Sequence, residues 1–156
     1  MEITQAIEKV KSSDTYSGWD HSGYHLAHVF FMTGKPAQVG FFNEKEGSMV
    51  TFDADSKANM NESKELLTVG GKVEELEIDK LRVKKEEAIE KVKELLDKEY
   101  PKESLKQEMI ILQQLERPIY NITYFTSSFK TLNIKIDGVS GDIISHDIKP
   151  LIDIDR

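Results

Sequence analysis

Hydrophobic side chains recur with helical spacing in two segments of the chain. The first stripe predicts a short amphipathic helix over residues 3–11, ending near Ser12. The second predicts a longer helix that ends at Tyr100, because Pro101 disfavours helical geometry in the residue before it. The apolar positions are Ile3, Ala6, Ile7 and Val10 in the first stripe and Ala88, Ile89, Val92, Leu95 and Leu96 in the second.

Most other apolar residues lie in short runs that predict β-strands. These runs are 24–32, 37–42 and 48–52 in the first half, and 105–113, 119–126, 129–136 and 142–148 in the second. The strand 129–136 alternates, with Leu132, Ile134 and Ile136 on one face and Thr131, Asn133 and Lys135 on the other. One buried face and one wet face predict an antiparallel sheet with a helix on a single side.

Two segments of the sequence are repeated. The hexapeptide AIEKVK occurs at 6–11 and again at 88–93, an offset of 88 − 6 = 82. Residues 42–53 also align with 136–147, placing Gly47 over Gly141 at an offset of 141 − 47 = 94. This pattern predicts an internal duplication with about twelve extra residues in the later half. We therefore predict an α+β protein of two tandem units, each a helix on an antiparallel sheet.

The composition along the chain suggests where these units begin and end. Residues 1–54 would form the first unit, in which the loop 14–23 replaces the first strand after the helix. Hydrophobicity falls from Asp53 to Gly71, so residues 55–75 are predicted to be a linker. Residues 76–156 would form the second unit.

The second half resembles the PepSY domain family, over residues 76–148. The match is carried by 88–92 in the helix, Tyr100-Pro101 at its end, the strand 119–122 and the run 136–144 (IDGVSGDII). PepSY domains are known from propeptides of thermolysin-type metallopeptidases and from bacterial germination and membrane proteins. The resemblance implies a PepSY/cystatin-like fold that binds or restrains peptidases. The first half would be a degenerate copy, with Asn43 in place of Asp137 and Ser17 in place of the proline.

Composition and charge exclude several classes of partner. The chain of 156 residues has a net charge of −7, and its first 78 residues carry seven Lys against thirteen Asp or Glu. Neither half has the basic stripe that phosphate binding requires, so nucleic acid is not an expected partner. No apolar run approaches the roughly 20 residues that span a bilayer. Without cysteine the chain forms no disulfides. We expect a cytoplasmic protein if Met1 is the native start, and an extracytoplasmic one if the sequence is truncated.

One segment gathers side chains that could form a binding surface, namely Tyr16, Trp19, His21, Tyr24 and His25. The same aromatic residues could instead form a satellite core under the loop, which is favoured because aromatic side chains contribute most when buried.

The nearby set Asp20, His21, His25 and His28 has the donor types of a zinc or nickel site. His25 and His28 should point to opposite faces of a strand, because three is an odd step in a period of two. We therefore predict no metal site and no cofactor.

No sequence motif predicts catalysis. The chain contains no HExxH, GxSxG, P-loop or dinucleotide fingerprint. We therefore predict a non-enzymatic protein-binding or peptidase-inhibitory module, with a peptidase or a membrane sensor as partner. The alternative is a small-molecule or ion-binding protein that uses a cleft between the two units, lined by residues 16–28. The sequence predicts no oligomeric state.

Overall fold

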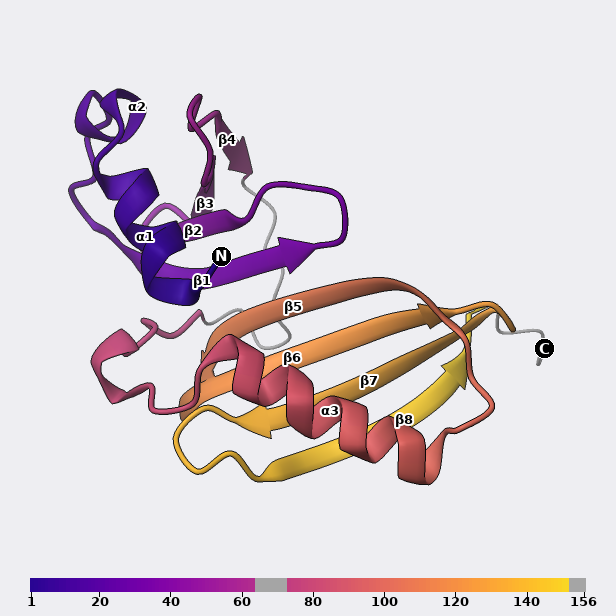
Figure 1. Cartoon of the computed structure of the whole chain (residues 1–156). Helices are drawn as coiled ribbons and strands as arrows, with labels where there is room; N and C mark the ends of the chain where they lie inside the picture. Colours follow the sequence, from indigo (N-terminus) through magenta and orange to yellow (C-terminus); the bar gives the residue numbers. More distant parts are fainter. Residues whose placement is uncertain (64–72, 152–156) are drawn as a thin grey trace.

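The computed structural model describes residues 1–63 and 73–151, and it contains one antiparallel sheet of eight strands (Figure 1). The first half comprises α1 (Ile3–Lys11), α2 (Asp14–Ser17), β1 (Tyr24–Met32), β2 (Gln38–Asn43), β3 (Ser48–Asp53) and β4 (Met60–Ser63). The second half comprises η1 (Ile78–Lys80), α3 (Lys85–Glu99), β5 (Leu105–Leu115), β6 (Arg117–Thr126), β7 (Lys130–Asp137) and β8 (Ile143–Pro150). The strand order is β4-β3-β2-β1-β5-β6-β7-β8.

The predicted α+β class with an antiparallel sheet is confirmed, but the two halves do not carry separate sheets. Strand β1 pairs antiparallel with β5, from His28 opposite Gln113 to Met32 opposite Met109, and this pairing makes the sheet continuous. Two local predictions were wrong. A short helix, α2, forms within the predicted loop, where the Ser13 side chain caps it by accepting a bond from the Tyr16 amide. Strand β4 lies within the predicted linker; residues 64–72 of that linker are outside the described residues.

The order of the long helices and strands is the same in the two halves, while the short α2 and η1 have no counterpart. Each long helix, α1 and α3, is followed by four strands that pair in succession. The prediction that the first half lacks a strand was therefore wrong. The alignment of Gly47 with Gly141 was also wrong, because Gly47 lies between the second and third strands of its half and Gly141 between the third and fourth.

The turn at Asp55 in the first half occupies the same position as the turn at Asp137 in the second half. Each lies between the third and fourth strands of its half. The Asp55 side chain accepts hydrogen bonds from the amides of Lys57 and Ala58, at 3.0 and 2.9 Å. Asp137 likewise accepts from the amides two and three residues later. The separation 137 − 55 = 82 equals that of the two AIEKVK segments. A single offset thus relates the helices and these turns, without the twelve extra residues predicted in the later half.

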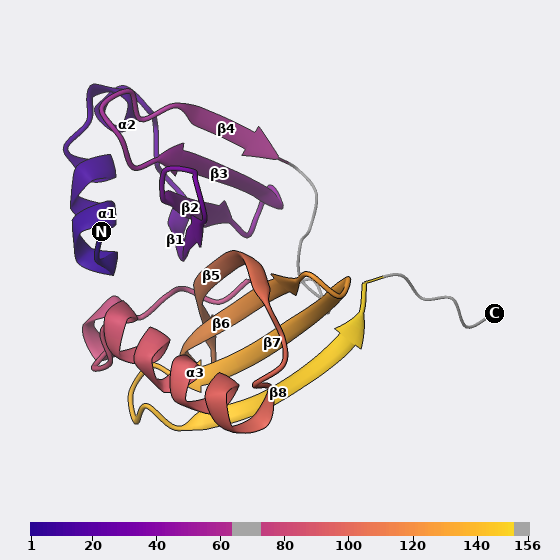
Figure 2. The same ribbon diagram turned by 45° about the vertical axis from the view of Figure 1, so that its right-hand side comes forward.

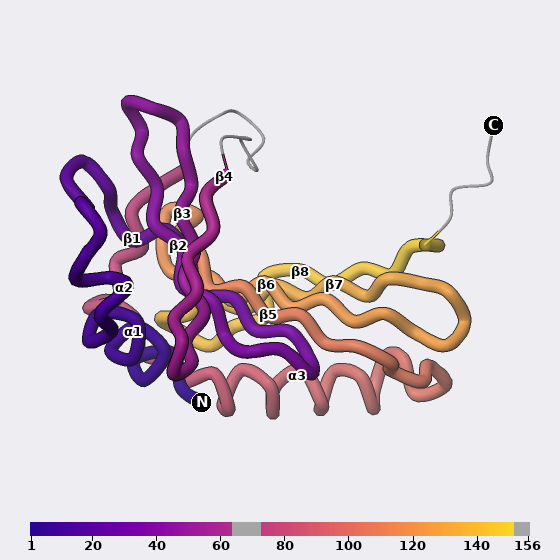
Figure 3. The backbone as a smooth tube through the Cα atoms, turned by 90° about the horizontal axis from the view of Figure 1, so that it is seen from above, coloured from indigo at the N-terminus to yellow at the C-terminus, as the bar shows by residue number. Residues whose placement is uncertain are grey.

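Both long helices cover the same face of the sheet and enclose one core (Figures 1 and 2). Helix α1 buries Ala6 and Val10, and α3 buries Ala88 and Val92. Ile89 and Leu96 are partly buried against the same core, so the predicted orientation of α3 is confirmed. The strands contribute Val29, Val39, Phe52, Leu112, Tyr120, Ile122, Leu132 and Ile134, all almost fully buried. Seen from above, the sheet twists strongly, so β2 to β4 run steeply across the direction of β6 to β8 (Figure 3).

Several contacts besides the β1–β5 pairing hold the two halves together. The Lys85 ammonium, at the start of α3, lies 4.2 Å from the centre of the Phe31 ring on β1. The Leu76 amide donates to the carbonyl of Leu26, also on β1, at 2.8 Å. Cation–π contacts of this kind contribute about 1 kcal/mol when partly desolvated. These contacts place the residues before α3 against the first half.

Candidate functional site

The predicted aromatic surface in residues 16–28 is largely part of the core. The Trp19 ring lies 5.1 Å from Phe52 and 4.7 Å from Tyr24, and Tyr16 lies 5.5 Å from Phe41. The Tyr24 hydroxyl also bonds Ser48 Oγ at 2.8 Å. Tyr16, Trp19 and Tyr24 therefore extend the core beside α1 and keep only part of their surface exposed.

The two histidines of the predicted surface lie on opposite faces of the sheet. His21 is exposed on the helix-covered side, where it stacks on Tyr16 at 5.4 Å. His25 pairs with Phe42 and contacts its ring at 5.9 Å on the other face, which carries no helix in the part of the chain that the structure describes. The five predicted residues thus do not form one surface.

His25 and His28 lie on the same face of the sheet, so the prediction that they point to opposite faces was wrong. A β-bulge at Ala27 shifts the register between Leu26 and His28, so His25 faces Phe42 and His28 faces Gly40. The extra residue restores the alternation, and both imidazoles lie on the helix-free face. His21 remains on the opposite side. Within residues 1–63 and 73–151, no group of three or more His, Asp or Glu side chains could hold a metal ion.

His28 packs over a glycine in the sheet. A methyl group added at Gly40 would lie 2.6 Å from His28 Nε2, so only glycine accommodates this ring. Burial lowers the pKa of His28 from 6.5 to about 4, because the charged imidazolium would lose its hydration there. The ring is therefore neutral at physiological pH.

The helix-free face carries an apolar strip where β1 meets β5. Phe30 pairs with Ile111, and the next position on this face pairs Met32 with Met109. All four side chains keep part of their surface exposed. Methionine adapts its shape easily and recurs at surfaces that bind several partners.

A groove follows β7 and β8 on the same face. One part, of about 590 Å³, is lined by Thr123, Thr131, Asn133, Lys135, Ser145, His146, Asp147 and Lys149. The His146 ring itself bonds the Tyr100 hydroxyl on the helix-covered side, so this residue contributes its backbone to the groove. The adjoining part, of about 340 Å³, is lined by Leu115, Glu116, Arg117, Ile119, Lys135, Asp137 and Ile144. Lys135 belongs to both parts. We call this combined feature the β7–β8 groove.

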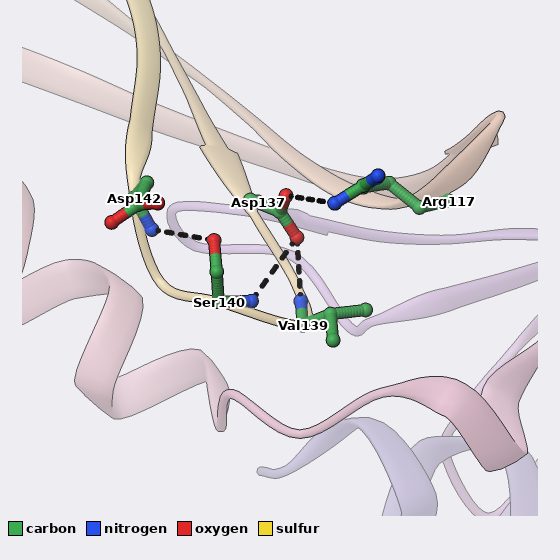
Figure 4. Close-up of polar contacts among 5 residues, drawn as sticks. All are labelled: Arg117, Asp137, Val139, Ser140 and Asp142. Atoms are coloured by element: carbon green, nitrogen blue, oxygen red, sulfur yellow. Dashed lines mark hydrogen bonds and ion pairs between the residues drawn. The ribbon is translucent and has the colours of Figure 1, made fainter.

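Asp137, the last residue of β7, lines the β7–β8 groove, and Figure 4 shows its polar contacts. Its carboxylate accepts hydrogen bonds from the amides of Val139 and Ser140, at 2.8 and 3.2 Å. It also accepts one from the Arg117 guanidinium, at 2.8 Å. Burial opposes ionisation of this side chain, yet these amides and Arg117 together lower the pKa of Asp137. Gly141, with φ of 83°, completes the turn.

Strand β8 is an exposed edge of the sheet. Seven of its eight residues are exposed and the eighth, Ile148, packs partly against the core. A register shift between Lys135 and Ile136, where β7 pairs with β8, leaves Ile144 52% exposed in the β7–β8 groove. The sequence predicted the polar face of β7, but contained no signal for this groove, because the shift that exposes Ile144 depends on how β8 pairs.

Comparison with known proteins identifies one similar structure and no family. No family model and no curated protein matches the chain. The crystal structure of a putative lipoprotein from Clostridium difficile 630 is similar over 96% of this chain and 93% of that one, with a TM-score of 0.58 and 15% identity. At this identity the likeness concerns the fold alone. Among the described residues, no helix has the length and hydrophobicity needed to cross a membrane.

Proposed function

We propose that the protein is a non-enzymatic binding module that holds an extended segment of a partner protein on the helix-free face of its sheet. The observation that carries this proposal is the β7–β8 groove beside the exposed β8 strand. Extended segments bind such features through main-chain hydrogen bonds to an edge strand and through pockets for alternate side chains. The apolar strip around Phe30 and Ile111 adds a second contact surface.

We also propose that the two halves are tandem PepSY-like units joined through β1 and β5. The equal order of elements, the offset of 82 and the matching Asp55 and Asp137 turns support this duplication. A two-fold axis that passes between β1 and β5, perpendicular to the sheet, would relate the strands of one unit to those of the other, in the order β1 to β4 and β5 to β8. Two such units would present one continuous helix-free face, which is larger than either alone.

The resemblance to PepSY domains leads us to propose a peptidase or a membrane sensor as the partner, with inhibition or restraint as the outcome. The similarity to a putative lipoprotein supports a location outside the cytoplasm.

The alternative, a small-molecule or ion-binding protein, rests on a cleft between the units lined by residues 16–28. The aromatic side chains of that segment pack into the core, and both parts of the β7–β8 groove are lined by residues of the second half. We therefore rank this function second.

Site-specific photo-crosslinking tests the binding function. A benzoylphenylalanine at Ser145, on the groove, is compared with one at Glu94, exposed on α3. We expect discrete protein adducts from position 145 in cells that make the protein, and none from position 94. Equal adducts at both positions, or none at 145, would contradict the proposal. Turnover of generic peptidase, esterase or phosphatase substrates by the purified protein would contradict its non-enzymatic part.

A further inference from the structure

The β7–β8 groove has the length and direction to hold a short extended peptide. Its lining follows β7 from Thr131 to Asp137 and β8 from Ile144 to Lys149. At about 3.3 Å per residue, the β7 stretch is roughly 20 Å long. An extended peptide of about six or seven residues has the same length and the same two-residue repeat of side chains on one face.

Some charged side chains in the groove have an oppositely charged partner within the chain, whereas Lys135 has none in the part of the chain that the structure describes. Asp137 is bonded to Arg117 and to two amides, and Asp147 lies 3.5 Å from Lys149. The Lys135 ammonium, in the middle of the groove, has no hydrogen bond or ion-pair partner among the residues that the structure describes. This lysine is therefore available to a carboxylate from outside the chain.

The part of the groove that adjoins Lys135 includes the apolar side chains Leu115, Ile119 and Ile144. Ile119 is buried there, whereas Leu115 and Ile144 are 45% and 52% exposed. Burying these two side chains under an apolar ligand group would be favourable, because it removes apolar surface from water. Glu116 lines this part of the groove as well. A carboxylate of a ligand is therefore attracted to Lys135 and repelled where it approaches Glu116.

We infer that the β7–β8 groove selects an extended segment in which an apolar side chain and an Asp or Glu stand two residues apart. The apolar side chain packs on Leu115, Ile119 and Ile144, and the carboxylate pairs with Lys135. Side chains on one face of an extended chain are two residues apart. Lys135 is likewise two residues from Asp137, which lines the groove together with the apolar side chains. This inference rests on the proposed binding function and specifies its ligand.

Selection from a displayed library of random heptapeptides on the immobilised full chain tests this specificity. We expect the selected peptides to be enriched at least tenfold over the starting library in one pattern, an apolar and an acidic residue two positions apart, with one of the two orders dominating. The variant Lys135→Glu should abolish the acidic preference and favour Lys or Arg at that position. Ile144→Ser should reduce the apolar preference while keeping the acidic one.

Lys102→Glu is the matched control, because Lys102 is an exposed lysine in the turn after α3 and outside the groove. It should leave the selected pattern unchanged. Peptides that bind equally to the parent chain and to Lys135→Glu would overturn the groove assignment but leave the binding function standing. Failure to enrich any peptide on the parent chain would contradict both. Circular dichroism of each variant verifies that the fold is retained.

Discussion

His28 is a titratable side chain that the fold keeps neutral. Its pKa in the folded chain is about 4 against an ordinary value of 6.5, so between these values the unfolded chain binds more protons than the folded one. The stabilisation linked to His28 is therefore complete above about pH 6.5 and is lost as the pH falls toward 4. We expect a loss of about 2 kcal/mol between pH 7.5 and pH 4.5 from this residue.

Urea unfolding of the parent chain and of His28→Gln at several pH values measures this effect. Glutamine does not titrate, so the difference in unfolding free energy between the two proteins isolates the histidine. The parent should lose more stability than the variant as the pH falls below 6.5. Parallel pH profiles would show that His28 is already solvated in the folded chain.

Asp137 stabilises its turn with a charge that is partly shielded from water. Replacing Asp137 by alanine leaves the Val139 and Ser140 amides and Arg117 without their acceptor, and we expect a cost of about 2–3 kcal/mol at pH 7. The pKa of Asp137 is lowered on folding, so its contribution is present above pH 3.8 and is lost as the pH falls through the lowered value.

Chemical unfolding of Asp137→Ala at pH 7 provides the measurement. Asp142→Ala is the control, because Asp142 is exposed in the same loop and should change stability by less than about 0.5 kcal/mol. Equal effects of the two substitutions would show that the carboxylate bonds of Asp137 contribute nothing specific.

At the scale of elements, α3 is held to the sheet by a narrow apolar stripe. Val92 is completely buried at the centre of this helix, whereas Lys93 beside it is exposed. Truncating Val92 to alanine should cost about 2–4 kcal/mol, since it removes buried methyl groups and leaves a cavity. Thermal and urea unfolding give the measured value. Lys93→Ala, as the matched surface change, should cost less than about 0.5 kcal/mol; a similar small loss in both variants would contradict the observed orientation.

At the scale of the whole molecule, one core and one sheet extend over both halves. The buried cluster includes residues of α1 and α3, and Leu112 of β5 pairs with Val29 of β1 at the junction. We therefore expect a single cooperative unfolding transition. Fluorescence of Trp19, the single tryptophan, reports on the first half, and hydrogen exchange of β6 and β7 amides reports on the second.

The substitution Leu112→Ala should lower the unfolding midpoint of both probes together, because Leu112 is fully buried at the junction of the halves. Two separated transitions in the parent chain, or a shift in one probe alone, would instead indicate two domains that unfold independently.

The sequence by itself determined most of the local structure. The stripes through Val10 and Val92 specified both long helices, because only a 3.6-residue period places those side chains on one face. Seven of the eight strands follow from apolar runs, with ends displaced by a few residues. The exception is β4, whose four residues are all exposed; it exists because β3 offers it hydrogen bonds, and no apolar pattern predicts it.

Only the tertiary structure decided how these elements combine. Pairing of β1 with β5 depends on residues about eighty positions apart, so local periodicity contains no information about it. The bulge at Ala27 places His25 and His28 on one face, and the register shift near Ile144 exposes that side chain in the β7–β8 groove. Both are adjustments of register between strands. The residue types that make up the candidate site are thus set by the sequence, whereas their juxtaposition depends on which strands meet and in what register.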